Sequence, residues 1–591
     1  MKGFPIFKNP LVYLCFFYII FVTLWINIIP FDKAPDEFVH YNYNVKFIID
    51  NKKLPVSGVN DIELIKLGRE NTFGKVQAIY SYNIYPQLNY IISAIFAVAL
   101  NFLFHINYEI GARYASLFWG IIYIIFIYSL INKILNNKYK AFILTACFSF
   151  IPQIIFISSY TSQDIHSLAI SALLCYMLIC LVKEINEYKV NLSTIIKFSL
   201  SCALLLVTKM NYFIYIPFIA VYILWLTIIK KKLPNRLIIK MITCIFIISI
   251  LLSGFWYLRN YLLYKDLIGQ NFLLNEMSKY NPIGAEQHFN LDTAIFLIKN
   301  SGIFTIFKSA VAYFDYMSLG LDDYIYVILL ALSFVILLSI FINIIEKKNN
   351  KLLKYLFFLS AFILSTFFLL IFNSIKFDLQ LQGRYMFPII VPIILFLALY
   401  IKEYEEFFKY MKIMLSIVVI LLIMSTNLLI KTYCNYNLVP YKVEGAKQTD
   451  TSMFLDNVIN TTVYQEVNAD KNNLTEIDFN VATFQRENQE GVISLFLFDL
   501  ETGDIIATQE IDLSNVSDNS TLQFKFIPIK YSKNKKYAVQ IKATSDDKNN
   551  KLTFYTSNMD FFPDLVTKIN ESIVGQDISF VTYYRPEEYN N

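Results

Sequence analysis

Charged residues are scarce in this chain. Only 16% of its 591 residues are Asp, Glu, Lys or Arg, whereas 56% are hydrophobic and 17% are aromatic. Soluble globular domains carry about 25% charged residues, so the composition excludes a wholly soluble protein and indicates a chain that crosses a membrane several times. The net charge of +5 comes mostly from lysines in short loops. Because no basic stripe marks a soluble face, nucleic acid is not an expected partner.

Cysteine and histidine are also rare, with seven and four residues respectively. No pair of cysteines has the C-x-x-C spacing, which argues against a disulfide framework and against a zinc site. Six of the cysteines lie inside apolar runs and are interpreted as small core residues. These six are Cys15, Cys147, Cys175, Cys180, Cys202 and Cys244.

Long apolar runs are abundant. Twelve have about the length that a membrane span requires, and lysine and arginine collect in alternate short loops between them. Because basic loops stay cytoplasmic, the alternation works only if one early segment does not cross. The twelve segments are 11–31, 86–104, 113–132, 141–158, 165–182, 194–208, 211–229, 237–257, 323–345, 355–375, 385–401 and 411–431.

Segment 86–104 is the best candidate to lie in the interface or to re-enter, because it follows a long polar loop and begins at Pro86. Segment 194–208 is short and is the fallback. Excluding the first leaves about eleven spans, with the N-terminus in the cytoplasm and the C-terminus outside. Loops 32–111 and 258–322 then fall on the outer face.

The composition changes to polar, alternating sequence beyond residue 435. Runs with a period of two, such as 475–482, 492–498, 521–527 and 537–543, are typical of strands with one buried face. About eight of them in roughly 150 residues predict an antiparallel β-sandwich. The chain is therefore divided into a transmembrane domain, 1–435, and an extracytoplasmic domain, 436–591.

An acidic pair, Asp36-Glu37, follows the first span within Pro35-Asp36-Glu37-Phe-Val-His40. Carboxylates at the edge of a bilayer are costly unless they meet water, a metal or a substrate. One of them could take a proton from an acceptor hydroxyl. The structural alternative is an ordinary helix start, where proline and acidic residues are common.

Four further polar motifs fall on the same predicted face. Asp164 lies in a polar turn, and Lys209 interrupts an apolar stretch, where it either snorkels or pairs with an anion. The third motif contains Arg259-Asn260 at the end of a span, beyond what an aromatic belt explains. The fourth is Gln382-Gly383-Arg384-Tyr385, whose arginine fork suits a phosphate. Acid–base groups beside cations are what group transfer from a lipid phosphate requires.

These motifs resemble the GT-C superfamily of integral-membrane glycosyltransferases, in particular an uncharacterised bacterial branch related to protein O-mannosyltransferases and aminoarabinose transferases. The likeness covers roughly residues 10–400. It rests on the acidic motif, on Gly111-Ala-Arg113, on Ser162-Gln-Asp164, and on two longer motifs. These two are Trp256-x-x-Arg259-Asn260-x-x-x-Tyr264-x-Asp266 and Gln382-Gly383-Arg384-Tyr385-x-x-Pro388.

The resemblance implies an enzyme of the bacterial plasma membrane that takes a sugar from a polyprenyl-phosphate carrier. The sugar passes, with inversion, to a glycan, lipid or protein acceptor. Asp36 or Glu37 would be the catalytic base, and Arg384, Arg259 and Lys209 would contact the phosphate. The remaining substrate-binding candidates are His40, Asp164, Asn260, Gln382 and Tyr385. A divalent metal is compatible with the acidic pair, although too few ligands are evident to predict one.

Two other functions fit the composition. A lipid-linked glycan transporter would carry its charges near the bilayer midplane, on broken helices, whereas these charges lie toward one face. A non-catalytic glycan-binding scaffold would use the sandwich and leave the acidic pair idle. The residues alone leave both open.

Overall fold

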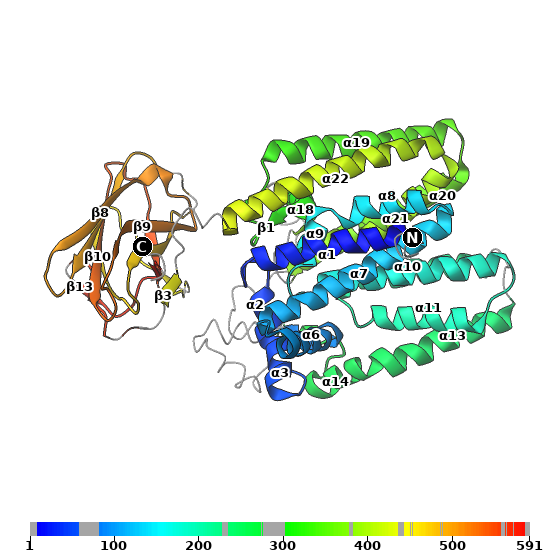
Figure 1. The fold of residues 1–591 in the computed structure, drawn as a ribbon, viewed down its shortest axis with the longest axis horizontal. Coiled ribbons are helices and arrows are strands. Elements are labelled where there is room, and N and C mark those ends of the chain that lie inside the picture. Colours follow the sequence, from blue (N-terminus) through cyan, green and yellow to red (C-terminus); the bar gives the residue numbers. More distant parts are fainter. Residues whose placement is uncertain are drawn as a thin grey trace, which may run out of the picture. The chain divides into compact units, whose positions relative to one another are not determined.

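The protein is represented by a computed structural model. It describes residues 9–57, 82–226, 234–273, 275, 302–376, 382–434 and 443–585, apart from 450, 452, 485, 487, 557–561, 563 and 571. The chain forms two compact units, Met1–Cys434 and Asn435–Asn591. The first is helical and the second is made of strands (Figure 1).

The helices of the first unit run side by side (Figure 1). Asn9 caps the first of them, with its side chain accepting a hydrogen bond from the backbone of Leu11. Pro152 begins α9 and separates it from α8, since proline is tolerated only in the first turn of a helix. The main helices are α1 (Pro10–Ile28), α7 (Tyr108–Leu135), α8 (Lys138–Ser149), α9 (Pro152–Ile157), α10 (Asp164–Asn186), α11 (Leu192–Leu205), α12 (Tyr215–Leu224), α13 (Asn235–Ser249), α14 (Phe255–Tyr264), α18 (Ile303–Val311), α19 (Asp323–Glu346), α20 (Asn350–Lys376), α21 (Ile390–Glu403) and α22 (Phe408–Leu429).

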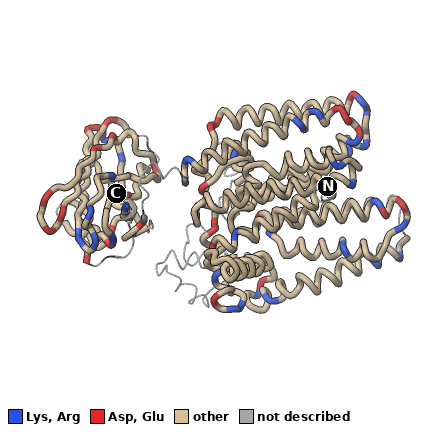
Figure 2. Tube along the Cα trace, viewed as in Figure 1, with Lys and Arg blue, Asp and Glu red and all other residues tan. Residues whose placement is uncertain are grey.

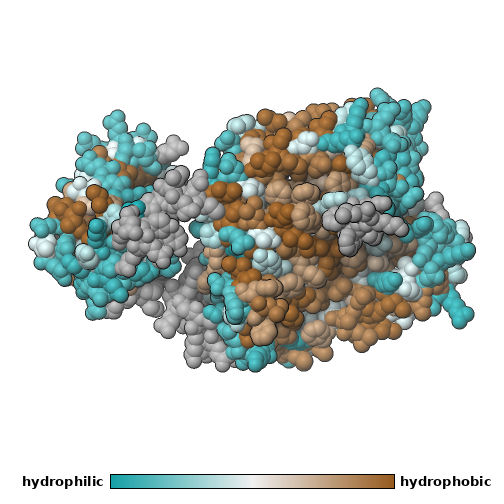
Figure 3. Space-filling model, in the orientation of Figure 1, coloured by the Kyte–Doolittle hydropathy of each residue, from teal (hydrophilic) through white to brown (hydrophobic). Residues whose placement is uncertain are grey.

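Among the described residues, eight helical stretches are long and apolar enough to cross a membrane. Figure 3 shows the hydrophobic surface they produce, with hydrophilic residues at both ends of the bundle. The prediction of a multi-pass membrane protein is confirmed. The count of eleven is not settled, because it also needs the broken pair α8–α9 and the shorter helices α11 and α12.

Apart from residues 227–233, which lie outside the described part of the chain, the loops predicted to be basic lie at one end of the bundle, where α1 begins (Figure 2). Segment 86–104, predicted not to cross, forms α6 (Leu88–Phe104). Figure 1 shows α6 strongly foreshortened, lying across the direction of α1, α7 and α10. That this segment does not cross the membrane stays a prediction. A Cβ on Gly111 of α7 would lie 2.8 Å from the Ala97 Cα, so α6 and α7 touch through their backbones.

The second unit is a β-sandwich with antiparallel pairing between its strands. One sheet has the order β13-β12-β5-β10-β7-β8, and the other has β3-β14-β6-β11-β4, with β9 also paired to β6. Eight of the strands have five or more residues, the number expected from the alternating pattern. These are β3 (Val443–Gln448), β5 (Thr461–Asn468), β6 (Leu474–Ala482), β7 (Val492–Asp499), β8 (Ile505–Asp512), β9 (Ser520–Ile529), β10 (Lys536–Thr544) and β14 (Phe580–Tyr584); the shorter ones are β4 (Met453–Phe454), β11 (Thr553–Thr556), β12 (Thr567–Ile569) and β13 (Ser572–Val574).

The core of the sandwich follows the period-two pattern. Along β7, alternate residues from Ile493 to Leu497 are buried, and the residues between them are partly exposed. They pack against Phe479 of β6 and Phe554 of β11 in one hydrophobic cluster. Both sheets thus bury their inner faces against each other, as alternating side chains require.

The backbone contact at Gly111 predicts that Gly111→Ala destabilises the helical unit. Alanine usually stabilises a helix over glycine, but here its Cβ would lie 2.8 Å from the Ala97 backbone, and overpacking costs about 1–3 kcal/mol. Gly254→Ala is the matched control, because its nearest neighbour would lie 3.6 Å away. Thermal unfolding in detergent should show a lower midpoint for the first variant alone. Equal midpoints would contradict the close crossing.

Candidate active site

The loop after α1 carries an unusual backbone. Asp36 has φ of 62°, in the left-handed region, and precedes the four-residue helix α2 (Glu37–His40). A π-helix, η2 (Tyr41–Lys46), follows directly. Non-glycine residues with positive φ and π-helical turns are both uncommon and are concentrated at functional sites.

Asp36 forms an ion pair with Arg384, from the far end of the helical unit's sequence. The Arg384 Nη2 donates to Asp36 Oδ2 at 2.6 Å, and the Tyr82 hydroxyl donates to the same oxygen at 3.1 Å. The arginine side chain is 4% exposed and the aspartate side chain 33%. Asp36 therefore keeps access to solvent on one side while the cation behind it is buried.

A second pair adjoins the first. Asp164, at the start of α10, accepts from the Lys209 ammonium at 2.7 Å, and its other carboxylate oxygen lies 3.6 Å from Arg384 Nη1. Tyr385 lies beneath both cations, with its ring centroid 4.3 Å from Lys209 Nζ and 5.4 Å from the Arg384 guanidinium carbon. Four segments distant in sequence thus bring two carboxylates and two cations together.

The charges set the protonation of the outer loop. Burial alone would raise the pKa of Asp36, but the charge of Arg384, helped by His40 and hydrogen bonds from Arg384 and Tyr82, outweighs it and lowers the pKa to about 2. Burial lowers the pKa of His40 to about 3, despite the opposing effect of Asp36. At neutral pH Asp36 is therefore ionised and His40 is uncharged.

Glu37 has a different environment from its neighbour. Its carboxylate is fully buried and accepts two hydrogen bonds of 2.6 Å from Nε and Nη2 of Arg113. The same guanidinium donates to the carbonyls of Ile26 and Ile29. Both carboxylate oxygens also accept from backbone N–H groups. Of the two predicted bases, only Asp36 has a side chain that is partly exposed to solvent.

His40 lies behind Asp36, between two tyrosines. Its Nδ1 is 2.6 Å from the Tyr90 hydroxyl, and its ring stacks on Tyr82 at 4.1 Å between centroids. Tyr82 in turn donates to Asp36. His40, which was predicted to bind substrate, is thus only 3% exposed. It packs against Tyr82, the residue that donates a hydrogen bond to Asp36.

Arg259 and Asn260 hold the outer loops. Arg259 donates to the Pro55 carbonyl at 2.5 Å, and Asn260 donates to the Ile84 carbonyl at 2.9 Å. Trp256 Nε1 binds the same Ile84 carbonyl at 3.1 Å. In the described chain, no hydrogen bond or ion pair joins Arg259 or Asn260 to the Asp36–Arg384 pair. Their contact with the site is indirect, because Ile84 belongs to the short helix η4 (Tyr82–Ile84), which carries Tyr82.

Arg384 is positioned by close packing between the backbone of Gly383, in the Gln382 motif, and the backbone of α18. A Cβ on Gly383 would lie 2.2 Å from the Ala310 nitrogen of α18, so only glycine fits there. Gly383 begins the 3₁₀ helix η9 (Gly383–Ile389), and Gln382 is the residue before it, with its carbonyl accepting from the Tyr385 N–H. Gln382 is partly buried and contributes through its backbone.

The residues missed from the sequence are mostly aromatic. Tyr82, Tyr90 and Tyr160 surround the charges, and the Tyr160 hydroxyl lies 3.4 Å from Arg384 Nη1. With 42 tyrosines in the chain, none of them stands out by type. Arg113 could have been singled out, since a lone arginine at the start of an apolar helix needs a buried partner.

A metal does not fit the charged cluster. Asp36 and Asp164 each face a cation at hydrogen-bonding distance. Among the described residues, no group of three or more His, Cys, Asp or Glu side chains is arranged to hold an ion. We therefore derive no step through a metal.

No family model and no curated protein matches the sequence.

The buried clamp predicts that Glu37→Gln is a folding defect. Losing one partner of a buried ion pair costs about 3–5 kcal/mol, because the Arg113 charge would remain buried without its counterion. Asp36→Asn, beside it, changes a partly exposed carboxylate and should cost far less. The measurement is the yield of monodisperse protein in detergent and its unfolding midpoint. Equal losses for both variants would contradict the assignment of Glu37 to the scaffold.

Proposed function

We propose that the protein is a membrane glycosyltransferase of the GT-C kind, with Asp36 as its base. It moves a sugar from a polyprenyl-phosphate carrier to a cell-surface glycan, lipid or protein, with inversion at the anomeric carbon. The observation that carries the proposal is the cluster of Asp36, Asp164, Lys209 and Arg384. The four residues meet beyond the end of α1, which lies at the end of the bundle opposite the loops predicted to be basic (Figure 1).

The cluster has the groups that the transfer needs. An acceptor hydroxyl attacks the anomeric carbon while the bond from that carbon to the carrier phosphate breaks. The hydroxyl proton passes to the carboxylate of Asp36, and the electron pair leaves on the phosphate oxygen. Arg384 and Lys209 offset the charge that develops there. Arg384 also has a buried Nε–H without a hydrogen-bond partner among the described residues, which a phosphate oxygen could accept.

The Asp36–Arg384 pair describes the state before substrate binds. With a pKa of about 2, Asp36 is a weak base while Arg384 contacts it. A phosphate that competes for the guanidinium would remove this stabilisation and leave burial to raise the pKa of Asp36. The donor would thus prepare the base by binding.

The proposed orientation follows from the loop charges. The lysine-rich loops and the N-terminus would lie in the cytoplasm of a bacterium, and the charged cluster would face outward. Because α22 ends on that same side of the bundle (Figure 1), the sandwich that follows it would also be outside the cell.

Transfer of labelled sugar from polyprenyl-phosphate donors in membranes tests the function. Asp36→Asn should lower the rate by about 10²–10⁴-fold, the usual contribution of a general base. Arg384→Gln should also abolish most of the transfer. Asp322→Asn is the matched control, since it removes an exposed acid that makes no side-chain cap to α19.

An unchanged rate in Asp36→Asn, with the protein correctly inserted, would overturn the assigned base. No transfer by the wild type from any common carrier would overturn the proposed donor. In that case, donor-dependent movement of the labelled lipid across the bilayer would identify a transporter.

The ion pair predicts how the protonation of Asp36 depends on pH. The wild-type carboxyl, with its lowered pKa, should stay ionised from about pH 7 down to about pH 3.5. In Arg384→Gln, the positive charge that opposes the effect of burial is absent. The pKa of Asp36 should therefore rise, and its carboxyl should gain a proton within that pH range. The infrared band of the protonated carboxyl measures this, with Asp36→Asn to identify it. Identical titrations of wild type and Arg384→Gln would contradict the role of Arg384.

A further inference from the structure

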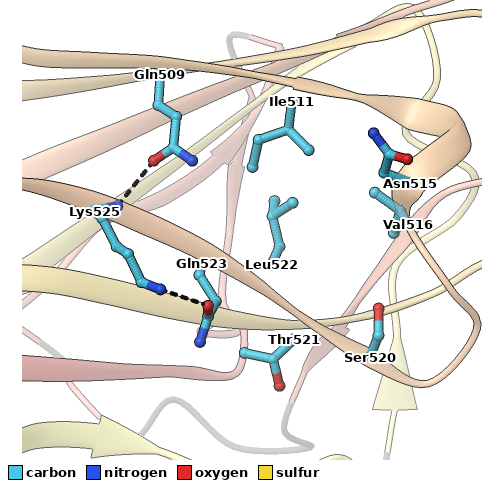
Figure 4. A pocket seen from close by; sticks show the side chains of 9 residues that line it. All are labelled: Gln509, Ile511, Asn515, Val516, Ser520, Thr521, Leu522, Gln523 and Lys525. Atoms are coloured by element: carbon cyan, nitrogen blue, oxygen red, sulfur yellow. Dashed lines mark hydrogen bonds between the residues drawn. The ribbon is translucent and has the colours of Figure 1, made fainter. Parts of the chain in front are cut away.

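Two surface cavities of similar size lie in the described part of the sandwich. One, of about 290 Å³, lies between β8 and β9. Among its polar residues, Gln509 accepts from the Lys525 N–H, and Lys525 Nζ donates to Gln523 (Figure 4). It has no aromatic residue. We infer no ligand there.

The other cavity, of about 330 Å³, lies where β6 ends. Its floor is small, because it consists of Ala482 on β6 and Thr553, the residue opposite it on β11. Tyr555 points to the same side of the sheet as Thr553, two residues away. It lies opposite Phe454 of the edge strand β4. The cavity is thus on the outer face of the sheet, since Phe554 between them is in the core.

Two exposed phenylalanines form one wall. Phe454 is 57% exposed and Phe484 is 42% exposed, and their rings meet edge to face at 5.4 Å. Phe484 has φ of 55°, a left-handed conformation that is rare for a bulky residue and is kept only where the surroundings require it. Exposure of such side chains gives up the free energy of burying them. A binding role accounts for both costs.

A fixed polar rim faces these rings. The Tyr555 hydroxyl donates to Asn519 Oδ1, and Asn519 Nδ2 lies 3.4 Å from Asp518 Oδ2. Asp518 Oδ1 accepts from the Thr483 N–H at 2.6 Å, which fixes the residue before Phe484. The rim therefore presents a phenol, an amide and a carboxylate in positions set by the fold.

We propose that this cavity binds a carbohydrate. A sugar ring has an apolar C–H face, which packs on aromatic rings, and equatorial hydroxyls, which bond to amide and carboxylate groups. One side of the cavity is formed by aromatic rings, and the other presents the amide and carboxylate groups. The Asp518 carboxylate disfavours a phosphate or another anion, and an apolar peptide would leave the polar rim without partners. The site is separate from the charged cluster and does not depend on the proposed transfer.

Binding of the full-length protein in nanodiscs to an array of hexose, pentose and N-acetylhexosamine oligosaccharides tests the proposal. The wild type should retain specific glycans, and Phe454→Ala/Phe484→Ala should bind them at least about tenfold more weakly, the scale of losing two aromatic contacts. Tyr531→Ala is the matched control, because Tyr531 is 81% exposed and lies outside the cavity. Asp36→Asn should bind as the wild type does, which separates this site from the active site.

Asn519→Gly provides a second variant that keeps the fold, since glycine accepts the positive φ of 53° at this position. It should also weaken binding. The proposal would be overturned by a wild type that retains no glycan, or by glycan binding as strong as that of the wild type in both the double variant and Asn519→Gly. Loss of binding in Asp36→Asn, with both cavity variants unaffected, would assign the glycan to the active site instead.

Discussion

The helical unit depends on one guanidinium. Arg113 lies near the start of α7, and its side chain extends to the end of α1. The last carbonyls of α1 have no partner within the helix, and little water is available to them at the predicted membrane edge. It binds the Ile26, Ile29 and Pro30 carbonyls and both oxygens of Glu37. In this way it fixes where the first helix ends and where the next loop turns. Asp36 acquires its position from that turn.

Charge balance is the second constraint. Asp36, Asp164, Lys209 and Arg384 form a set of two negative and two positive charges, whose sum is zero. Each charge has an opposite charge within 4 Å, which makes burial of the group tolerable. An anionic ligand would change this balance by one or two charges and compete directly with the carboxylates.

The sequence predicts the helices well because apolar length and loop charge are local properties. It also places Asp36, Asp164, Lys209 and Arg384 on one face, since each follows or precedes a span. It could not separate Asp36 from Glu37, because two adjacent acids differ only in which arginine they meet, and Arg113 and Arg384 are far away in sequence. Arg259 and Asn260 are grouped with the site for the same reason. The sequence indicates which residues share a face of the bundle, but it does not indicate which of them contact one another.

The distance in sequence between paired residues also determines the order in which the ion pairs can form during synthesis. Glu37 and Arg113 are 76 residues apart in the sequence, so this pair can form as soon as α7 has entered the membrane. Asp164 and Lys209 are also near each other. The ion pair between Asp36 and Arg384, by contrast, can form only after nearly four hundred residues have been synthesised. The Glu37–Arg113 pair that supports the outer loop can thus form long before the Asp36–Arg384 pair, and a chain truncated before Arg384 would lack one of the four charges of the cluster.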